Sequence, residues 1–212
     1  MIGKGPNVHD VIEICRSECS AIIQGNWEDG FFAAHTAEKT GGDTSWFNPK
    51  NNYYREKAGD VIIEYLGALP HSVEFVLSGK LVRLFHTHPI NFNRYFADSS
   101  IELRRELFGY SEDSTNKRES DIAVYADIHC VYLQSIDGRI LMNCGSVGNP
   151  LDITEASYVM LEGGAGFASP SIQFLRVPYD IDKAVDMARG AGIPYLEEYI
   201  TELRTGRYFK RG

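Results

Sequence analysis

The stretch that decides the fold is residues 122–150, which read IAVYADIHCVYLQSIDGRILMNCGSVGNP. Three short apolar runs, at 122–125, 131–134 and 140–143, have the composition of strands. Asp137-Gly138 lies between the second and third runs and is typical of a tight hairpin turn. Polar residues follow the first and third runs. Because α/β sheets carry their binding residues at the carboxyl ends of strands, the stretch predicts a site at one sheet edge.

Elsewhere in the chain, hydrophobic spacing predicts further strands and helices. The predicted strands are 21–23, 73–77, 80–85, 158–161 and 172–177. The predicted helices are 8–15 with Asn7 as its cap, 57–69, 99–108, 180–189 and 195–204. Polar segments at 25–29, 41–52 and 109–120 are expected to be loops. Ser78-Gly79 joins two of the strands and suggests a hairpin. The alternation favours a single α/β domain.

Length and charge limit the classes of function. The chain has 212 residues, of which 43% are hydrophobic and 24% charged, as in a globular domain with a sizeable core. Its formal net charge of -8 repels phosphate backbones and argues against a nucleic-acid scaffold role. A small phosphorylated substrate is still allowed, because a bound metal ion can reverse the charge locally.

Apolar segments and cysteine usage indicate the cellular compartment. No apolar run reaches the roughly 20 residues needed to span a bilayer, and Met1 to Pro6 contains no apolar core of a signal peptide. The cysteines, at positions 15, 19, 130 and 144, are too scattered for a disulfide framework. Free thiols are favoured over a zinc site at Cys15 and Cys19, since no second pair follows. We therefore expect a cytoplasmic protein without membrane contact.

Polar groups come at predicted strand ends in four places, which are Gly25-Asn26, His86, Asp127-Ile128-His129 and 143–150. Each has an ordinary structural interpretation, because strand-end histidines are often satisfied by hydrogen bonds and Gly-Asn pairs often make turns. Gly145 and Gly148 are expected to permit positive φ and close backbone approach. Their shared position after strands predicts that Asn26, His86, Asp127 and His129 lie in one cleft.

The order of these motifs carries a family resemblance. Along the chain they are Gly25-Asn26-Trp27-Glu28-Asp29, His86-Thr87-His88-Pro89, Ala126-Asp127-Ile128-His129 and the segment from Asn143 to Pro150. This order resembles the calcineurin-like metallophosphoesterase superfamily, and more narrowly the bacterial predicted phosphodiesterases of the diadenosine-tetraphosphatase-like subfamily. Segments 3–6, 176–180 and 192–195 resemble the same subfamily, so that the resemblance covers nearly the whole chain.

The resemblance implies a fold, a chemistry and ligands. The fold would be a two-sheet α/β/β/α sandwich formed by residues 1–212 as one domain. Asn26 and His86 would bind one divalent metal ion and His129 a second, with Asp127 at a position where relatives have histidine. Mixed amide, imidazole and carboxylate ligands suit Mn, Fe, Ni or Zn. The implied function is metal-dependent hydrolysis of a phosphodiester, nucleotide or phosphomonoester.

The chain departs from the family pattern at its start. The family's Asp-x-His and Gly-Asp motifs are not found, so we expect a domain that lacks the first strand-helix-strand unit, with a reading frame that continues upstream of Met1. Trp27 also replaces a histidine that many relatives use to protonate the leaving group. The alternative function is a non-catalytic domain that binds a ligand or partner. An uncovered sheet edge would invite dimerisation.

Overall fold

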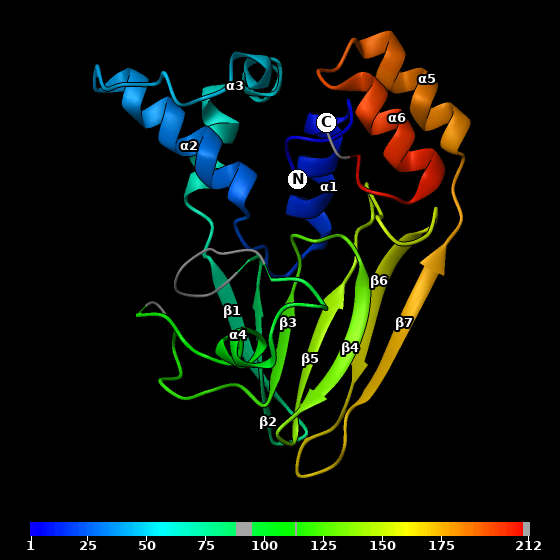
Figure 1. The fold of residues 1–212 in the computed structure, drawn as a ribbon. Helices are drawn as coiled ribbons and strands as arrows, with labels where there is room; N and C mark the ends of the chain where they lie inside the picture. Colours follow the sequence, from blue (N-terminus) through cyan, green and yellow to red (C-terminus); the bar gives the residue numbers. More distant parts are fainter. Residues whose placement is uncertain (88–94, 113, 210–212) are drawn as a thin grey trace.

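A computed structural model describes residues 1–87, 95–112 and 114–209 (Figure 1). The helices in these ranges are α1 (Val8–Glu18), α2 (Asn26–Lys39), α3 (Asn52–Gly67), α4 (Ile101–Glu106), α5 (Ile181–Ala191), α6 (Leu196–Thr205) and a 3₁₀ turn, η1 (Pro49–Asn51). The strands are β1 (Ser72–Leu77), β2 (Lys80–Phe85), β3 (Ile122–Tyr125), β4 (Val131–Ile136), β5 (Arg139–Cys144), β6 (Ala156–Glu162) and β7 (Ser171–Val177).

The strands form two sheets. The larger has five strands in the order β1-β2-β3-β5-β4, and the smaller is the β6-β7 hairpin. Strands β2, β3 and β5 are parallel neighbours, whereas β1 and β4 pair antiparallel at the two edges. Both edge hairpins were predicted, and both turns are confirmed. Ser78 and Gly79 have φ of 51° and 73°, and Asp137 and Gly138 have φ of 50° and 77°, as two-residue hairpin turns require.

Alternating residues of the central strands build two separate cores. On the face toward α4 the core contains Phe85, Leu107, Phe108, Tyr125 and Leu141. On the opposite face the core contains Val82, Ile122, Val124 and Met142, covered by Val159, Leu161, Ile172 and Phe174 of the β6-β7 hairpin. The central strands are therefore covered on both faces, which explains their unbroken apolar runs.

The other helices lie beyond one end of the sheets, in the upper half of Figure 1. Helices α1, α2 and α3 share a core that includes Ile12, Phe31, Tyr54, Ile63 and Leu66. Helices α5 and α6 pack around Val185, Ala188, Ile200 and Leu203. No helix within the described ranges is both long enough and apolar enough to cross a membrane.

A buried arginine connects the loop after α4 to the sheet through hydrogen bonds. Arg83 of β2 has no solvent exposure, and Glu74 of β1 is 5% exposed. The Nε atom of Arg83 donates to Glu74 at 2.6 Å. Its two Nη atoms donate to backbone carbonyls of Phe108, Gly109, Asn116 and Arg118. A guanidinium with this many partners is satisfied in the interior, as a buried charge must be.

Several predicted boundaries are wrong, and two of them concern the site. Residues 21–23 are not a strand but part of an irregular segment, in which Gln24 donates its backbone N–H to the carbonyl of Pro70 at 2.8 Å. Residues 26–29 are the first turn of α2 and not a loop. A three-residue apolar run cannot specify a strand unless a neighbour pairs with it, and here the backbone is bonded elsewhere.

Helix α2 continues to Lys39 through a segment for which no helix was predicted, and η1 lies within the predicted loop 41–52. The remaining differences are shifts of helix ends. Helix α3 begins at Asn52 rather than near residue 57 and is kinked at Gly59, whose φ is 72°. Helix α4 is shorter than the predicted 99–108, because the Ser100 side chain caps it by accepting from the N–H of Leu103. The predicted α/β class with two packed sheets is confirmed.

Candidate metal centre

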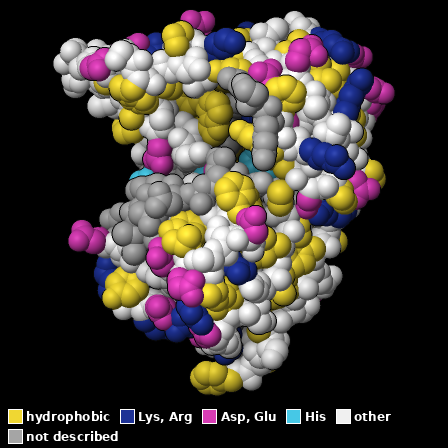
Figure 2. All heavy atoms as spheres, viewed as in Figure 1, with side chains coloured by type: hydrophobic (Ala, Val, Ile, Leu, Met, Phe, Trp, Pro, Cys, Tyr) yellow, Lys and Arg dark blue, Asp and Glu magenta, His cyan; other side chains and the backbone are white. Residues whose placement is uncertain are grey.

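The parallel strands bring three of the predicted motifs to one edge of the sheet. His86 follows β2, Asp127 and His129 follow β3, and Asn143 lies at the end of β5. Because β2, β3 and β5 are adjacent and parallel, their carboxyl ends share an edge. A backbone hydrogen bond from Ala126 N–H to the carbonyl of His86, at 3.0 Å, continues the pairing beyond the strands. Figure 2 shows a hollow between the helices and the sheets, with histidine side chains at its floor.

Asn26 reaches this edge from the first turn of α2. The approach depends on Gly25, the residue before the helix. A Cβ atom built on Gly25 would lie 2.8 Å from Oε2 of Glu28 and 3.1 Å from Nδ1 of His86. The first contact would force the Glu28 carboxylate to move, and the second would press on the His86 ring. The absence of a Cβ at Gly25 therefore lets the helix start lie directly against the His86 ring.

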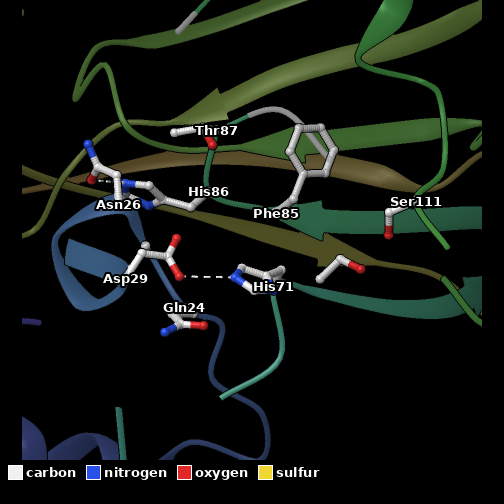
Figure 3. Close-up of a pocket in the computed structure, with 10 residues that line it drawn as sticks. Gln24, Asn26, Asp29, His71, Phe85, His86, Thr87 and Ser111 are labelled. Carbon is white, nitrogen blue, oxygen red and sulfur yellow. Dashed lines mark hydrogen bonds and ion pairs between the residues drawn. The ribbon is translucent and has the colours of Figure 1, made fainter. Parts of the chain in front are cut away.

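Three donor atoms of different chemistry meet here. The Nε2 atom of His86 lies 3.1 Å from Oδ1 of Asn26 and 3.8 Å from Oδ1 of Asp127, and Nδ2 of Asn26 lies 3.4 Å from the same Asp127 oxygen. Figure 3 shows the Asn26 and His86 side chains pointing toward each other. The side chains of Asp127 and His86 are 4% and 25% exposed, whereas Asn26 is exposed to solvent.

The segment after β3 is held in a strained conformation. Asp127 has a φ of 62° and His129 a φ of 58°, in the left-handed region that non-glycine residues rarely adopt. A 2.7 Å hydrogen bond from Ile128 N–H to the carbonyl of Ala126 closes a three-residue turn around Asp127. Such strain costs about 1–3 kcal/mol per residue and is concentrated at functional sites.

His129 is fixed by the segment after β5. Its Nδ1 lies 2.8 Å from the carbonyl oxygen of Asn149 and 3.2 Å from that residue's Oδ1. A ring whose Nδ1–H donates to a carbonyl leaves Nε2 as the acceptor, the arrangement found in metal-ligating histidines. Asn149 is 1% exposed, and its Nδ2 has no hydrogen-bond partner in the part of the chain that the structure describes.

Glu28 joins the first residues of the chain to this site. One of its carboxylate oxygens accepts from the backbone nitrogens of Met1 at 2.7 Å and Ile2 at 3.2 Å. The other accepts from Gly25 N–H at 3.1 Å and caps α2. Glu28 is 4% exposed, so these hydrogen bonds compensate the burial of its charge.

Both histidines are neutral at pH 7. Burial lowers the pKa of His86, although the carboxylates of Asp127 and Glu28 oppose that shift. Burial also lowers the pKa of His129. The hydrogen bond from His129 to Asn149 opposes this shift, and the Lys4 ammonium reinforces it. Neutral imidazole is the form that binds a metal ion.

The donor set fits a divalent cation. Bonds of about 2.1 Å from a metal ion place neighbouring ligand atoms roughly 3 Å apart; Asn26 Oδ1 lies at such a separation from His86 Nε2, at 3.1 Å, and Asp127 Oδ1 lies farther away, at 3.8 Å. No cluster of three or more His, Cys, Asp or Glu with metal-binding spacing occurs within the described ranges. With the amide oxygen of Asn26 as a third ligand beside His86 and Asp127, the residues present could hold a divalent cation such as Mn, Fe, Ni or Zn.

The glycines after β5 differ from one another. Gly145 has the expected positive φ, at 74°, and a Cβ there would lie 2.1 Å from Oγ of Ser157. The same expectation for Gly148 is wrong, because its φ is not in the left-handed region and a Cβ there would meet nothing within 4 Å. The backbone N–H of Gly145 donates to Oδ1 of Asn143 at 2.9 Å, which fixes the Asn143 side chain at the end of β5.

No protein-family model matches the chain, and no curated protein matches it. Among solved structures, a hypothetical protein from Pyrococcus horikoshii OT3 has a TM-score of 0.72 at 16% sequence identity, with 98% of this chain and 82% of that chain covered. A metallophosphoesterase from Sphaerobacter thermophilus has a TM-score of 0.68 at 18% identity, with 96% and 84% covered. The fold is that of a metallophosphoesterase. At these identities the likeness establishes the metallophosphoesterase fold alone.

Sequence reasoning missed some contacts among the polar residues of the candidate site. The contact between Glu28 and Gly25 could have been predicted from the sequence, because the two residues have the spacing of a capping box. No local sequence pattern predicts the contact of His129 with Asn149, because 20 positions separate the two residues. The pairing of Asp29 with His71, in the pocket that holds Asn26 and His86, likewise had no local signal.

Proposed function

We propose that this chain is a metal-dependent phosphoesterase that hydrolyses a small phosphorylated substrate. The substrate class is a phosphodiester, a nucleotide or a phosphomonoester. The observation that carries the proposal is the approach of two oxygen atoms to His86 Nε2 at the sheet edge, Oδ1 of Asn26 at 3.1 Å and Oδ1 of Asp127 at 3.8 Å. The metallophosphoesterase fold supports it.

In this proposal Asn26, His86 and Asp127 hold one divalent cation, and His129 faces the same cleft through Nε2. The cation would supply Lewis-acid polarisation of the phosphoryl group and make a water molecule more acidic. The neutral rings of His86 and His129 provide lone pairs without first losing a proton. The strained turn around Asp127 keeps its carboxylate at the cleft.

Lys4 is a candidate for contact with an anionic substrate, although its ammonium is paired with a carboxylate. Its Nζ lies 2.5 Å from Oε2 of Glu202, which is 2% exposed, while the Lys4 side chain is 35% exposed. Its charge acts on His129. An ammonium held in this way attracts a phosphate as a point charge. We therefore include Lys4 among the groups that would contact the substrate.

The test combines metal binding with turnover. The purified chain is stripped of metal, titrated with Mn²⁺ by calorimetry, and assayed with bis(p-nitrophenyl) phosphate and p-nitrophenyl phosphate. His86→Ala should weaken Mn²⁺ binding by at least about tenfold and abolish turnover. His9→Ala is the matched control, because His9 is exposed on α1. Absence of turnover by the wild type overturns the proposal, and metal binding without turnover supports the alternative of a non-catalytic binding domain.

A further inference from the structure

The pocket that holds Asn26 and His86 contains a second pair of polar side chains, Asp29 and His71 (Figure 3). The Nε2 atom of His71 lies 3.0 Å from Oδ1 of Asp29. Asp29 follows Asn26 by three positions on α2, which puts both side chains on one side of the helix. His71 immediately precedes β1. The pair therefore lies beside the candidate metal ligands without belonging to them.

The side chains of this pair are more exposed than those of two candidate metal ligands, His86 and Asp127. His71 and Asp29 are 42% and 37% exposed, compared with 25% for His86 and 4% for Asp127. Thr87 and Ser111 also line the pocket. The pocket thus holds two of the candidate metal ligands, Asn26 and His86, together with an imidazole–carboxylate pair.

Phosphoester hydrolysis requires a proton donor for the leaving group, and the candidate metal ligands cannot provide one. When an unactivated ester is cleaved, the departing oxygen must receive a proton, because an alkoxide is a poor leaving group. Side chains that hold a cation through their lone pairs have no proton to give. Imidazole is the side chain most used for proton transfer near neutral pH, and a carboxylate on its second nitrogen stabilises the protonated form.

We propose that His71, oriented by Asp29, donates the proton to the leaving group. The inference rests on the proposed phosphoesterase function. In the step, a water oxygen bonds to phosphorus while the bond from phosphorus to the leaving oxygen breaks. The leaving oxygen takes a proton from the His71 imidazolium, and the attacking water releases one proton to solvent. The ring then regains a proton from water, while Nε2–H continues to donate to Asp29.

A structural role for the pair predicts something different. The contact joins α2 to the start of β1 across 42 positions, so its loss could simply loosen the pocket. Loosening would slow all substrates by a similar factor. Loss of a proton donor instead slows substrates with basic leaving groups far more than those whose leaving group departs without a proton.

The experiment compares two esters of one phosphodiester series that differ only in the leaving group, p-nitrophenol or phenol, in the presence of Mn²⁺. His71→Gln should lower kcat for the phenyl ester by about 10²–10⁴-fold, and kcat for the p-nitrophenyl ester by less than tenfold. Asp29→Asn should produce the same selective loss at smaller size. Mn²⁺ affinity should be unchanged in both variants, and His9→Gln should change neither ester.

The outcomes separate the two proposals. Equal losses for both esters, or no loss for either, would overturn the role of His71 and leave the phosphoesterase function standing. Wild-type protein that turns over neither ester would overturn the proposed function, and this inference with it. Selective loss with the phenyl ester in both His71→Gln and Asp29→Asn would support the assignment.

Discussion

The Nε2 atom of His86 lies 3.1 Å from Oδ1 of Asn26, although 60 positions separate the two residues. One residue follows a central strand and the other begins a helix. Their contact joins the helical half of the molecule to the sheet edge at the point where Asp127 also arrives.

If Asn26 and His86 bind one cation, their effects on affinity should not add. Asn26→Ala and His86→Ala should each weaken Mn²⁺ binding by about tenfold or more, and the double variant should lose less than the sum, with a coupling of about 0.5–3 kcal/mol. Calorimetric titration of the four proteins measures this. Asn7→Ala combined with His9→Ala on α1 is the control pair, and strict additivity at Asn26 and His86 would contradict a shared ion.

Gly25→Ala should damage the site through crowding alone. The added Cβ would press on Oε2 of Glu28 at 2.8 Å and on the His86 ring at 3.1 Å, and such overpacking costs about 1–3 kcal/mol. Gly30→Ala is a matched control within α2, because a Cβ there meets nothing within 4 Å and alanine favours helix by about 0.5–1 kcal/mol. Urea unfolding should move the two variants in opposite directions. The same sign for both would count against the close approach.

Substitutions at Asp127 should affect stability through the backbone and metal binding through the carboxylate. Its φ of 62° suits glycine, so Asp127→Gly should be more stable than Asp127→Ala by about 1 kcal/mol. Both variants should bind Mn²⁺ more weakly, because both lack the carboxylate. Thermal unfolding and calorimetry on the two variants check the two parts separately. Equal stability of the glycine and alanine variants would show that the turn is not strained.

The Glu74–Arg83 pair should make stability fall in acid. Burial alone would raise the pKa of Glu74, but hydrogen bonds from Asn116 and Arg83 outweigh it and hold the pKa below its usual value. A depressed carboxyl pKa contributes stability above the unfolded value of about 4.5, and that stability is lost as pH falls through the folded pKa. Wild type should therefore lose more stability than Glu74→Gln between pH 6 and pH 3.

Loss of the Glu74–Arg83 pair should also lower the free energy of unfolding at neutral pH. Glu74→Gln should destabilise the protein by about 3–5 kcal/mol at pH 7, because it leaves the fully buried Arg83 without its carboxylate. Urea unfolding at both pH values gives the two differences. Parallel pH curves for wild type and variant would exclude this contribution.

Gly145 and Gly148 should respond differently to alanine. At Gly145 the φ of 74° and the 2.1 Å approach to Ser157 Oγ oppose any side chain, so Gly145→Ala should cost about 1–3 kcal/mol. It should also disturb the end of β5, where Asn143 bonds Gly145. Gly148→Ala should be close to neutral, because neither condition applies there. A neutral Gly145→Ala would show that the backbone at this strand end adapts.

The local sequence determined the sheet of this protein. Strand runs at 73–77, 80–85, 122–125, 131–134 and 140–143 were each identified to within a few residues. Ser78-Gly79 and Asp137-Gly138 specified their turns because tight hairpins need residues that tolerate positive φ. These features depend on neighbours along the chain, so spacing and turn chemistry were enough to place His86, Asp127 and His129 after strands.

The tertiary structure alone decided what surrounds those strand ends. Residues 21–23 are irregular and Asn26 starts a helix, because the backbone there bonds to Pro70 and to the Glu28 carboxylate rather than to a strand. Asp29 meets His71 across 42 positions, and Asn26 meets Asp127 across 101. Contacts between residues so far apart arise from the packing of whole helices against sheets, which no local pattern of residues encodes.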